Sequence, residues 1–127
     1  MKVKGIMTRK VVEITKGCLI TEAAELMRKK DISCLVITCG TSIEGIVTER
    51  DVLRKIIAEQ KMFSQISISE IMTAPVVTIE EETEIYDAVD LMARKHIRRL
   101  VVTNGGKMTG IVTESDFVRV LRKLKGP

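Results

Sequence analysis

Aromatic residues are almost missing from this chain of 127 residues. It has no tryptophan, and its only aromatic side chains are Phe63, Tyr86 and Phe117. Proteins that bind single-stranded nucleic acid without sequence preference stack its bases on aromatic side chains. We therefore expect no such stacking platform. The sequence also lacks the run of roughly 20 apolar residues that a membrane-spanning helix needs, and its N-terminus shows no signal-peptide pattern.

Cysteine is scarce as well, and this argues against a stapled or metal-centred fold. Cys18, Cys34 and Cys39 are odd in number and irregularly spaced, which favours neither a disulfide framework nor a zinc site. Reduced thiols favour a cytoplasmic location. The net charge of +4 is spread among interspersed acids and bases, so we expect a solvated helix surface and rank nucleic acid low as a partner. No nucleophile–base pair, metal cluster or phosphate-transfer loop is visible, so we predict no catalytic residues, no metal site and no enzyme activity.

What the sequence does contain is a duplication with a constant, gapless offset of about 65 residues. Ile6-Met7-Thr8 recurs as Ile71-Met72-Thr73, and Gly45 to Glu49 matches Gly110 to Glu114 without a change. Such a repeat indicates two copies of one structural unit. We predict a first repeat at 1–62, a linker at 63–70 and a second repeat at 71–127.

The spacing of apolar residues predicts the order strand, helix, strand, strand, helix in each copy, an α+β fold. One such unit has too little core to be stable alone, so we expect the two to pack sheet to sheet about a pseudo-twofold axis. In the first copy the expected elements are a strand at 11–14, a helix at 21–29, strands at 35–38 and 45–47 joined by a turn at 40–44, and a helix from 48. In the second they are a strand at 76–79, a helix at 83–94, strands at 100–103 and 110–112 joined by a turn at 104–106, and a helix at 114–124.

The most informative pattern is Gly-x-x-Thr-x-x-Asp, which occurs where the last strand of each copy meets its last helix. Its aspartates are Asp51 and Asp116, and its threonines are Thr48 and Thr113. A carboxylate one turn into a helix stays ionised beside the positive end of the helix dipole, and it accepts charge-assisted hydrogen bonds from a ribose diol. Free N–H groups at the helix start bind phosphate. The same pattern also fits a capping box, and the two roles are compatible.

These motifs, repeated in register over nearly the whole chain, resemble the CBS domain, a regulatory unit usually found as a tandem pair (a Bateman module). The resemblance implies a stand-alone sensor of AMP, ADP, ATP or an S-adenosylmethionine-type ligand that signals to a partner protein. It implies no required cofactor, a homodimer, and a ligand in the cleft between the repeats. The family's ribose-binding aspartate corresponds to Asp51 and Asp116, and its hydroxyl contact to Thr48 and Thr113.

The resemblance also implies an adenine slot lined by the opening segment and the second strand, with each Thr/Asp pair facing strand residues of the other repeat. Related family members carry a phosphate-binding basic residue before the second strand, where this chain has Arg98 and Arg99, and only one of these would face the cleft. The Asp51 site is then expected to take the more phosphorylated ligand. The slot residues are Thr8, Val11, Val12, Ile32, Ser33, Cys34, Ile46, Thr73, Val76, Val77, Ile97 and Ile111.

Two other functions remain open at this stage. The chain would be a ligand-free interaction and dimerisation module if the Thr/Asp pairs were caps only. It would be a nucleic-acid binder if its basic helix surfaces carried the function, with binding that falls steeply with salt.

Overall fold

The computed structural model describes residues 1–60, 62 and 65–125, and its chain divides into two compact units. The Asp51 unit is Val12–Val76. The Asp116 unit combines Met1–Val11 with the chain from Val77 onward. Each unit therefore contains the body of one repeat and the opening segment of the other.

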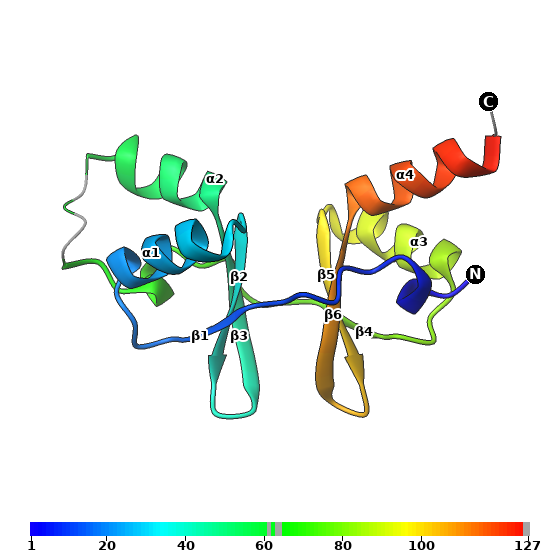
Figure 1. Ribbon diagram of the computed structural model, residues 1–127, viewed down its shortest axis with the longest axis horizontal. Helices are drawn as coiled ribbons and strands as arrows, with labels where there is room; N and C mark the ends of the chain where they lie inside the picture. Colours follow the sequence, from blue (N-terminus) through cyan, green and yellow to red (C-terminus); the bar gives the residue numbers. More distant parts are fainter. Residues whose placement is uncertain (61, 63–64, 126–127) are drawn as a thin grey trace. The chain divides into compact units, whose positions relative to one another are not determined.

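The Asp51 unit is a three-stranded sheet with both of its helices on one face (Figure 1). The sheet order is β1-β2-β3, with β1 parallel to β2 and β3 antiparallel to it. A parallel pair needs a crossover connection, which α1 supplies. The elements are β1 (Glu13–Thr15), α1 (Ile20–Lys30), β2 (Cys34–Cys39), β3 (Ser42–Thr48), α2 (Glu49–Val52), its π-helical continuation η2 (Leu53–Ile57), and the 3-10 turn η4 (Ile68–Glu70).

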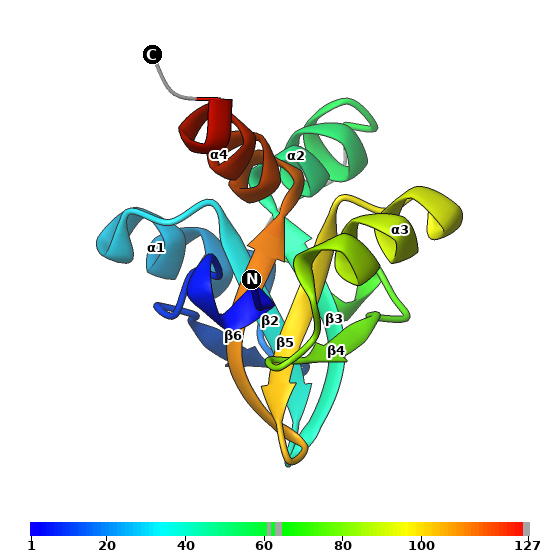
Figure 2. The ribbon, with the colours of Figure 1, turned by 90° about the vertical axis from the view of Figure 1, so that its right-hand side faces the viewer.

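The Asp116 unit repeats this arrangement with the sheet order β4-β5-β6. Its last helix, α4, follows directly from the end of β6, as Figure 2 shows. The opening of the chain lies beside α3 (Figure 1), where the Val3 amide donates to the Thr83 carbonyl at 2.8 Å. The elements are η1 (Val3–Gly5), β4 (Thr78–Glu80), α3 (Ile85–Lys95), β5 (Arg99–Asn104), β6 (Lys107–Thr113) and α4 (Glu114–Lys125).

The predicted α+β order is confirmed in both repeats, but both hairpin turns are shorter than predicted. The turn expected at 40–44 is wrong: only Gly40 and Thr41 form it, because Ser42 and Ile43 pair with Cys39 and Thr38 across the hairpin. The turn expected at 104–106 shrinks in the same way to Gly105 and Gly106, whose φ values of 59° and 88° favour glycine. In both hairpins the two strands stay paired up to a two-residue turn, which makes the strands longer than predicted.

Each helical face packs on its own sheet to form one core per unit. In the Asp51 unit, buried side chains come from α1 (Ile20, Ala23, Met27), from the sheet (Leu35, Ile37, Val47) and from the last helical turn (Ile56). In the Asp116 unit they come from the opening segment (Val3, Met7), from α3 (Ala88, Met92), from the sheet (Leu100, Val102, Val112) and from α4 (Phe117).

Two residues of the segment expected to be a linker lie in a core. Ile66 and Ile68 are buried in the Asp51 unit together with Ile71. Residues 63 and 64, the first of that segment, lie outside the described residues. No helix in the described part of the chain is both long enough and apolar enough to cross a membrane.

Candidate functional site

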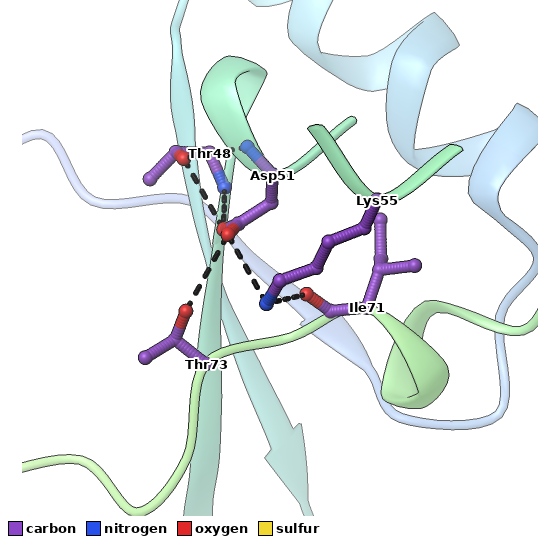
Figure 3. A network of polar contacts seen from close by, with 5 residues as sticks. All are labelled: Thr48, Asp51, Lys55, Ile71 and Thr73. Carbon is purple, nitrogen blue, oxygen red and sulfur yellow. Dashed lines mark hydrogen bonds and ion pairs between the residues drawn. The ribbon is translucent and has the colours of Figure 1, made fainter. Parts of the chain in front are cut away.

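The junction of β3 and α2 is a complete capping box around Asp51 (Figure 3). The Asp51 amide donates to the Thr48 hydroxyl at 3.2 Å, and the Thr48 amide donates to Asp51 Oδ2 at 2.9 Å. The Thr48 hydroxyl also lies 3.2 Å from Oδ2. Two backbone donors at the helix start are thus satisfied reciprocally. The box fixes the rotamer of Asp51 and fully engages one of its two carboxylate oxygens.

The second oxygen, Oδ1, faces two groups from elsewhere in the unit (Figure 3). The Thr73 hydroxyl lies 3.4 Å from Oδ1, and the Lys55 ammonium lies 3.3 Å from it. Lys55 also donates to the Ile71 carbonyl at 2.8 Å. The Asp51 side chain keeps 14% of its exposure, so the carboxylate is shielded but still reachable from solvent.

A close approach at Gly45 brings Thr73 to this site. Ile46 and Thr73 exchange two backbone hydrogen bonds, at 3.0 and 2.8 Å, so the opening segment of the second repeat runs along the free edge of β3. A Cβ on Gly45 would lie 2.6 Å from Met72 Sδ and 2.9 Å from the Thr73 carbonyl oxygen. Only glycine leaves room for that segment.

The Asp116 junction repeats the hydrogen bonds from the threonine to the aspartate carboxylate. The Thr113 amide donates to Asp116 Oδ2 at 2.8 Å, and the Thr113 hydroxyl lies 3.2 Å from that oxygen. Thr8 and Ile111 exchange backbone hydrogen bonds at 2.8 and 3.0 Å. A Cβ on Gly110 would lie 2.8 Å from the Thr8 carbonyl oxygen. The doubled motif therefore produces two sites with the same backbone frame.

The two sites differ in the cation that meets the aspartate. Asp51 pairs with Lys55, four residues later, whereas Asp116 Oδ1 pairs with Arg119, three residues later. The Asp116 side chain is only 4% exposed. The Thr113 hydroxyl also shares a hydrogen bond with Ser115 at 2.9 Å, where the first repeat has Arg50. The sequence analysis missed both cations, although i,i+3 and i,i+4 spacing of opposite charges on a helix signals such pairs.

The residues before each second strand lie at the junction of their own unit. The Ser33 carbonyl accepts from the Glu49 amide at 3.0 Å, and the Arg98 carbonyl accepts from the Glu114 amide at 3.1 Å. The Arg98 side chain is 63% exposed, and its nearest carboxylate oxygen, on Glu114, is 4.0 Å away. Half-buried Arg99 begins β5 opposite Thr113, as Cys34 begins β2 opposite Thr48. That the arginines serve the Asp51 site stays a prediction.

The remaining slot residues are apolar. Ile46 and Ile111 are buried at the edge strands, next to Thr73 and Thr8. Half-buried residues packed on the cores are Val12 and Ile32 in the Asp51 unit, and Val77 and Ile97 in the Asp116 unit. Val11 and Val76 are half-buried where the chain passes from one unit to the other. The described residues hold no cluster of His, Cys, Asp or Glu that would bind a metal ion.

A largely apolar groove of about 780 Å³ lies between α3 and α4 of the Asp116 unit, and the predicted site residues Ile97 and Arg98 are among those that line it. Its rim carries the exposed side chains of Tyr86, Val89, Val118 and Leu121. The corresponding groove between α1 and α2, of about 650 Å³, is lined in part by Arg28, Asp31 and Glu49 and is the more polar of the two.

The frame just described is that of a known family. The CBS-domain model matches residues 3–58 and 68–123, so this chain belongs to the CBS-domain family and carries two copies of the domain. CBS-domain pairs are generally regulatory modules that sense small-molecule ligands and form oligomers.

Individual relatives agree with this assignment. The chain is 41% identical over 101 residues to an uncharacterized protein of Methanopyrus kandleri, covering 78% of this chain and 52% of that protein. Thus it spans about half the length of that relative. Among solved structures it resembles a hexameric CBS-CP12 protein from bloom-forming cyanobacteria (TM-score 0.86, 29% identity, 100% of this chain and 75% of the other). It also resembles a CBS-domain containing protein from Agrobacterium tumefaciens (TM-score 0.81, 26% identity, 96% and 100%).

Proposed function

We propose that this CBS-domain pair is a non-catalytic sensor that binds an adenosine-containing ligand at the Asp51 and Asp116 junctions and passes its bound state to a partner protein. Candidate ligands are AMP, ADP, ATP and S-adenosylmethionine-type compounds. The observation that carries the proposal is the state of each aspartate: hydrogen bonds from the threonine of the motif fix Oδ2, while Oδ1 meets side chains that can move.

A ribose offers two neighbouring hydroxyl donors, and Oδ1 accepts them when the side chains that now contact it turn away. The Thr73 hydroxyl, 3.4 Å from Oδ1, makes a long hydrogen bond that a ribose hydroxyl replaces at little cost. A carboxylate acceptor makes the new bond stronger than a neutral one. Buried Ile46 and the half-buried valines nearby supply the apolar surface that an adenine ring prefers.

Phosphate binding is assigned to Arg98 or Arg99. Arg98 is mostly exposed and holds its nearest carboxylate only at 4.0 Å, so its guanidinium can turn to a ligand. A planar guanidinium binds two phosphate oxygens at once. A ligand with phosphate would therefore bind more tightly than adenosine.

Calorimetric titration with AMP, ATP and S-adenosylmethionine tests the proposal. The wild-type chain should bind at least one of them saturably, and the double variant D51A/D116A should lose that binding. Asp90 is a matched control, because it is an exposed helical acid that also pairs with a basic residue, Arg94. D90A should bind as the wild type does. No saturable binding to the wild type, or binding that survives the double substitution, would refute the proposal.

A second candidate function is assembly without a ligand, and the apolar groove between α3 and α4 favours it. Tyr86 is 81% exposed and Leu121 60% exposed, and large apolar side chains gathered at one groove are typical of interfaces. We propose that a second copy of the chain covers this groove in a homodimer. A melting temperature that does not rise with any nucleotide would favour assembly over sensing, because a ligand that binds only the folded state must raise it.

A further inference from the structure

The Lys55 ammonium pairs with Asp51 Oδ1, the carboxylate oxygen that would accept the hydroxyls of a ribose. It lies 3.3 Å from Asp51 Oδ1 and donates to the Ile71 carbonyl at 2.8 Å, so two acceptors hold it in place (Figure 3). Its side chain remains 41% exposed. The ammonium is therefore held by two acceptors but stays at the protein surface. It can move away from Asp51 Oδ1 toward a ligand and still donate to the Ile71 carbonyl.

The Asp116 site holds no lysine at the matching place. The residue that corresponds to Lys55 is Val120, and the cation on Asp116 is Arg119, which corresponds to Arg54. Among the described side chains no hydrogen bond links Thr8 to Asp116, whereas Thr73 reaches Asp51. The repeat therefore conserves the carboxylate and its cap and changes the cation beside it.

We propose that Lys55 sets the preference of the Asp51 site for phosphorylated ligands, an inference that rests on the proposed function. In the unbound site its ammonium neutralises Asp51. When a ribose hydroxyl takes Oδ1, the ammonium turns from that oxygen to the phosphate of the same ligand and keeps its bond to the Ile71 carbonyl. Lysine suits this role because its four-carbon stem is flexible and its head is a compact charge with three donors.

The charge balance at the site gives the reason. A bare carboxylate repels a phosphate a few ångströms away, and this repulsion is strong near a protein surface, where the effective dielectric constant is about 20. With Lys55 present the Asp51 pair is neutral, so the phosphate meets no net negative charge and gains a charge-assisted hydrogen bond. Neutral adenosine needs neither effect, and it gains access to Oδ1 when the lysine is removed.

The experiment is an NMR titration with adenosine and with AMP. Binding at each unit is monitored through the backbone amide signals of that unit. Ile46 and Thr73 report on the Asp51 site, while Thr8 and Ile111 report on the Asp116 site in the same sample. The variants are Lys55→Met, which removes the charge, and Lys55→Arg, which keeps it. Lys16→Met is the matched control, since Lys16 also belongs to the Asp51 unit and pairs with an acid, Glu44, at 3.9 Å.

At the Asp51 site, K55M should lower the preference for AMP over adenosine about tenfold, which corresponds to about 1.4 kcal/mol. K55R and K16M should keep the wild-type preference, and the Asp116 site should not respond to K55M. If K55M weakens the binding of AMP and of adenosine equally, Lys55 only maintains the shape of the site. If K55M leaves both affinities unchanged, Lys55 has no role in binding. Either result overturns this inference alone. A wild-type Asp51 site that binds neither adenosine nor AMP overturns this inference, and the proposed function fails with it only if ATP and S-adenosylmethionine do not bind either. The amide spectrum shows whether K55M folds, and Lys55→Gln replaces it if it does not.

Discussion

Replacing Gly45 by alanine should detach the opening segment of the second repeat from β3 and weaken the Asp51 site. The new Cβ would lie 2.6 Å from Met72 Sδ and 2.9 Å from the Thr73 carbonyl oxygen. The methionine side chain can turn away, but the carbonyl belongs to the backbone. The segment must therefore shift, and the two hydrogen bonds between Ile46 and Thr73 lengthen with it.

The expected loss of stability follows from those contacts. Each backbone hydrogen bond contributes about 1 kcal/mol net, and forcing a methyl group into a filled space costs about 1–3 kcal/mol. Alanine recovers about 0.4–1 kcal/mol by restricting the unfolded chain. The free energy of unfolding should fall by about 2–4.5 kcal/mol. The Thr73 hydroxyl should also leave Asp51, so ligand affinity at that site should fall.

Urea unfolding of G45A measures the fall in the free energy of unfolding, and hydrogen exchange at the Ile46 and Thr73 amides shows where the structure is weakened. The control is Gly17→Ala, because a Cβ there has no neighbour within 4 Å, and that variant should be about 0.4–1 kcal/mol more stable than the wild type. G110A should behave as G45A does, since its Cβ meets the Thr8 carbonyl oxygen at 2.8 Å. If G45A unfolds at the wild-type urea concentration with unchanged exchange, the close approach does not hold the segment, and this reasoning is wrong.

Three further predictions follow from other contacts. Asp116→Ala removes the carboxylate that caps α4 and pairs with Arg119, so the free energy of unfolding should fall by about 1–2 kcal/mol in urea titrations; an unchanged midpoint would contradict the cap. Leu121→Glu places a charge on the rim of the apolar groove, so light scattering should show a monomer where the wild type is a dimer; a monomeric wild type at micromolar concentration would remove the proposed dimer. The hydrogen bond from Lys2 lowers the pKa of Glu84, and the same bond raises the pKa of Lys2. The stability from Glu84 is therefore present above pH 4.5 and lost as the pH falls through its folded pKa, while that from Lys2 is lost only above pH 10.5. Melting temperatures of the wild type and E84Q should converge in acid, and a gap that persists well below pH 4.5 would contradict this assignment.

Much of the fold could be predicted because the duplication constrains it twice. The identical run from Gly45 to Glu49 and from Gly110 to Glu114 fixed the strand–helix junctions, and apolar spacing located α1 and α3. The strand ends were predicted less accurately, since nothing in the residue types of Ser42 and Ile43 distinguishes a strand from a turn. Where a hairpin closes is decided by the pairing of its two strands. Local propensity does not report that pairing.

The site was predictable in its aspartates and threonines but not in its cations. The sequence analysis chose Arg98 and Arg99 by resemblance and overlooked Lys55, because its role depends on the Ile71 carbonyl 16 residues away as well as on Asp51. The exchange of opening segments between the units was also hidden. Nothing in the periodicity of residues 66–76 says which sheet they join, and the close approach at Gly45 appears only in three dimensions.

A crystal structure of the protein grown with AMP would test the central claim most directly. The account predicts a nucleotide whose ribose hydroxyls lie within hydrogen-bond distance of the Asp51 or Asp116 carboxylate, with the Lys55 ammonium moved from Oδ1 toward the phosphate at the Asp51 site. A nucleotide bound elsewhere, such as in the groove between α3 and α4, or two junctions that stay empty at saturating AMP with their Thr–Asp hydrogen bonds unchanged, would contradict it.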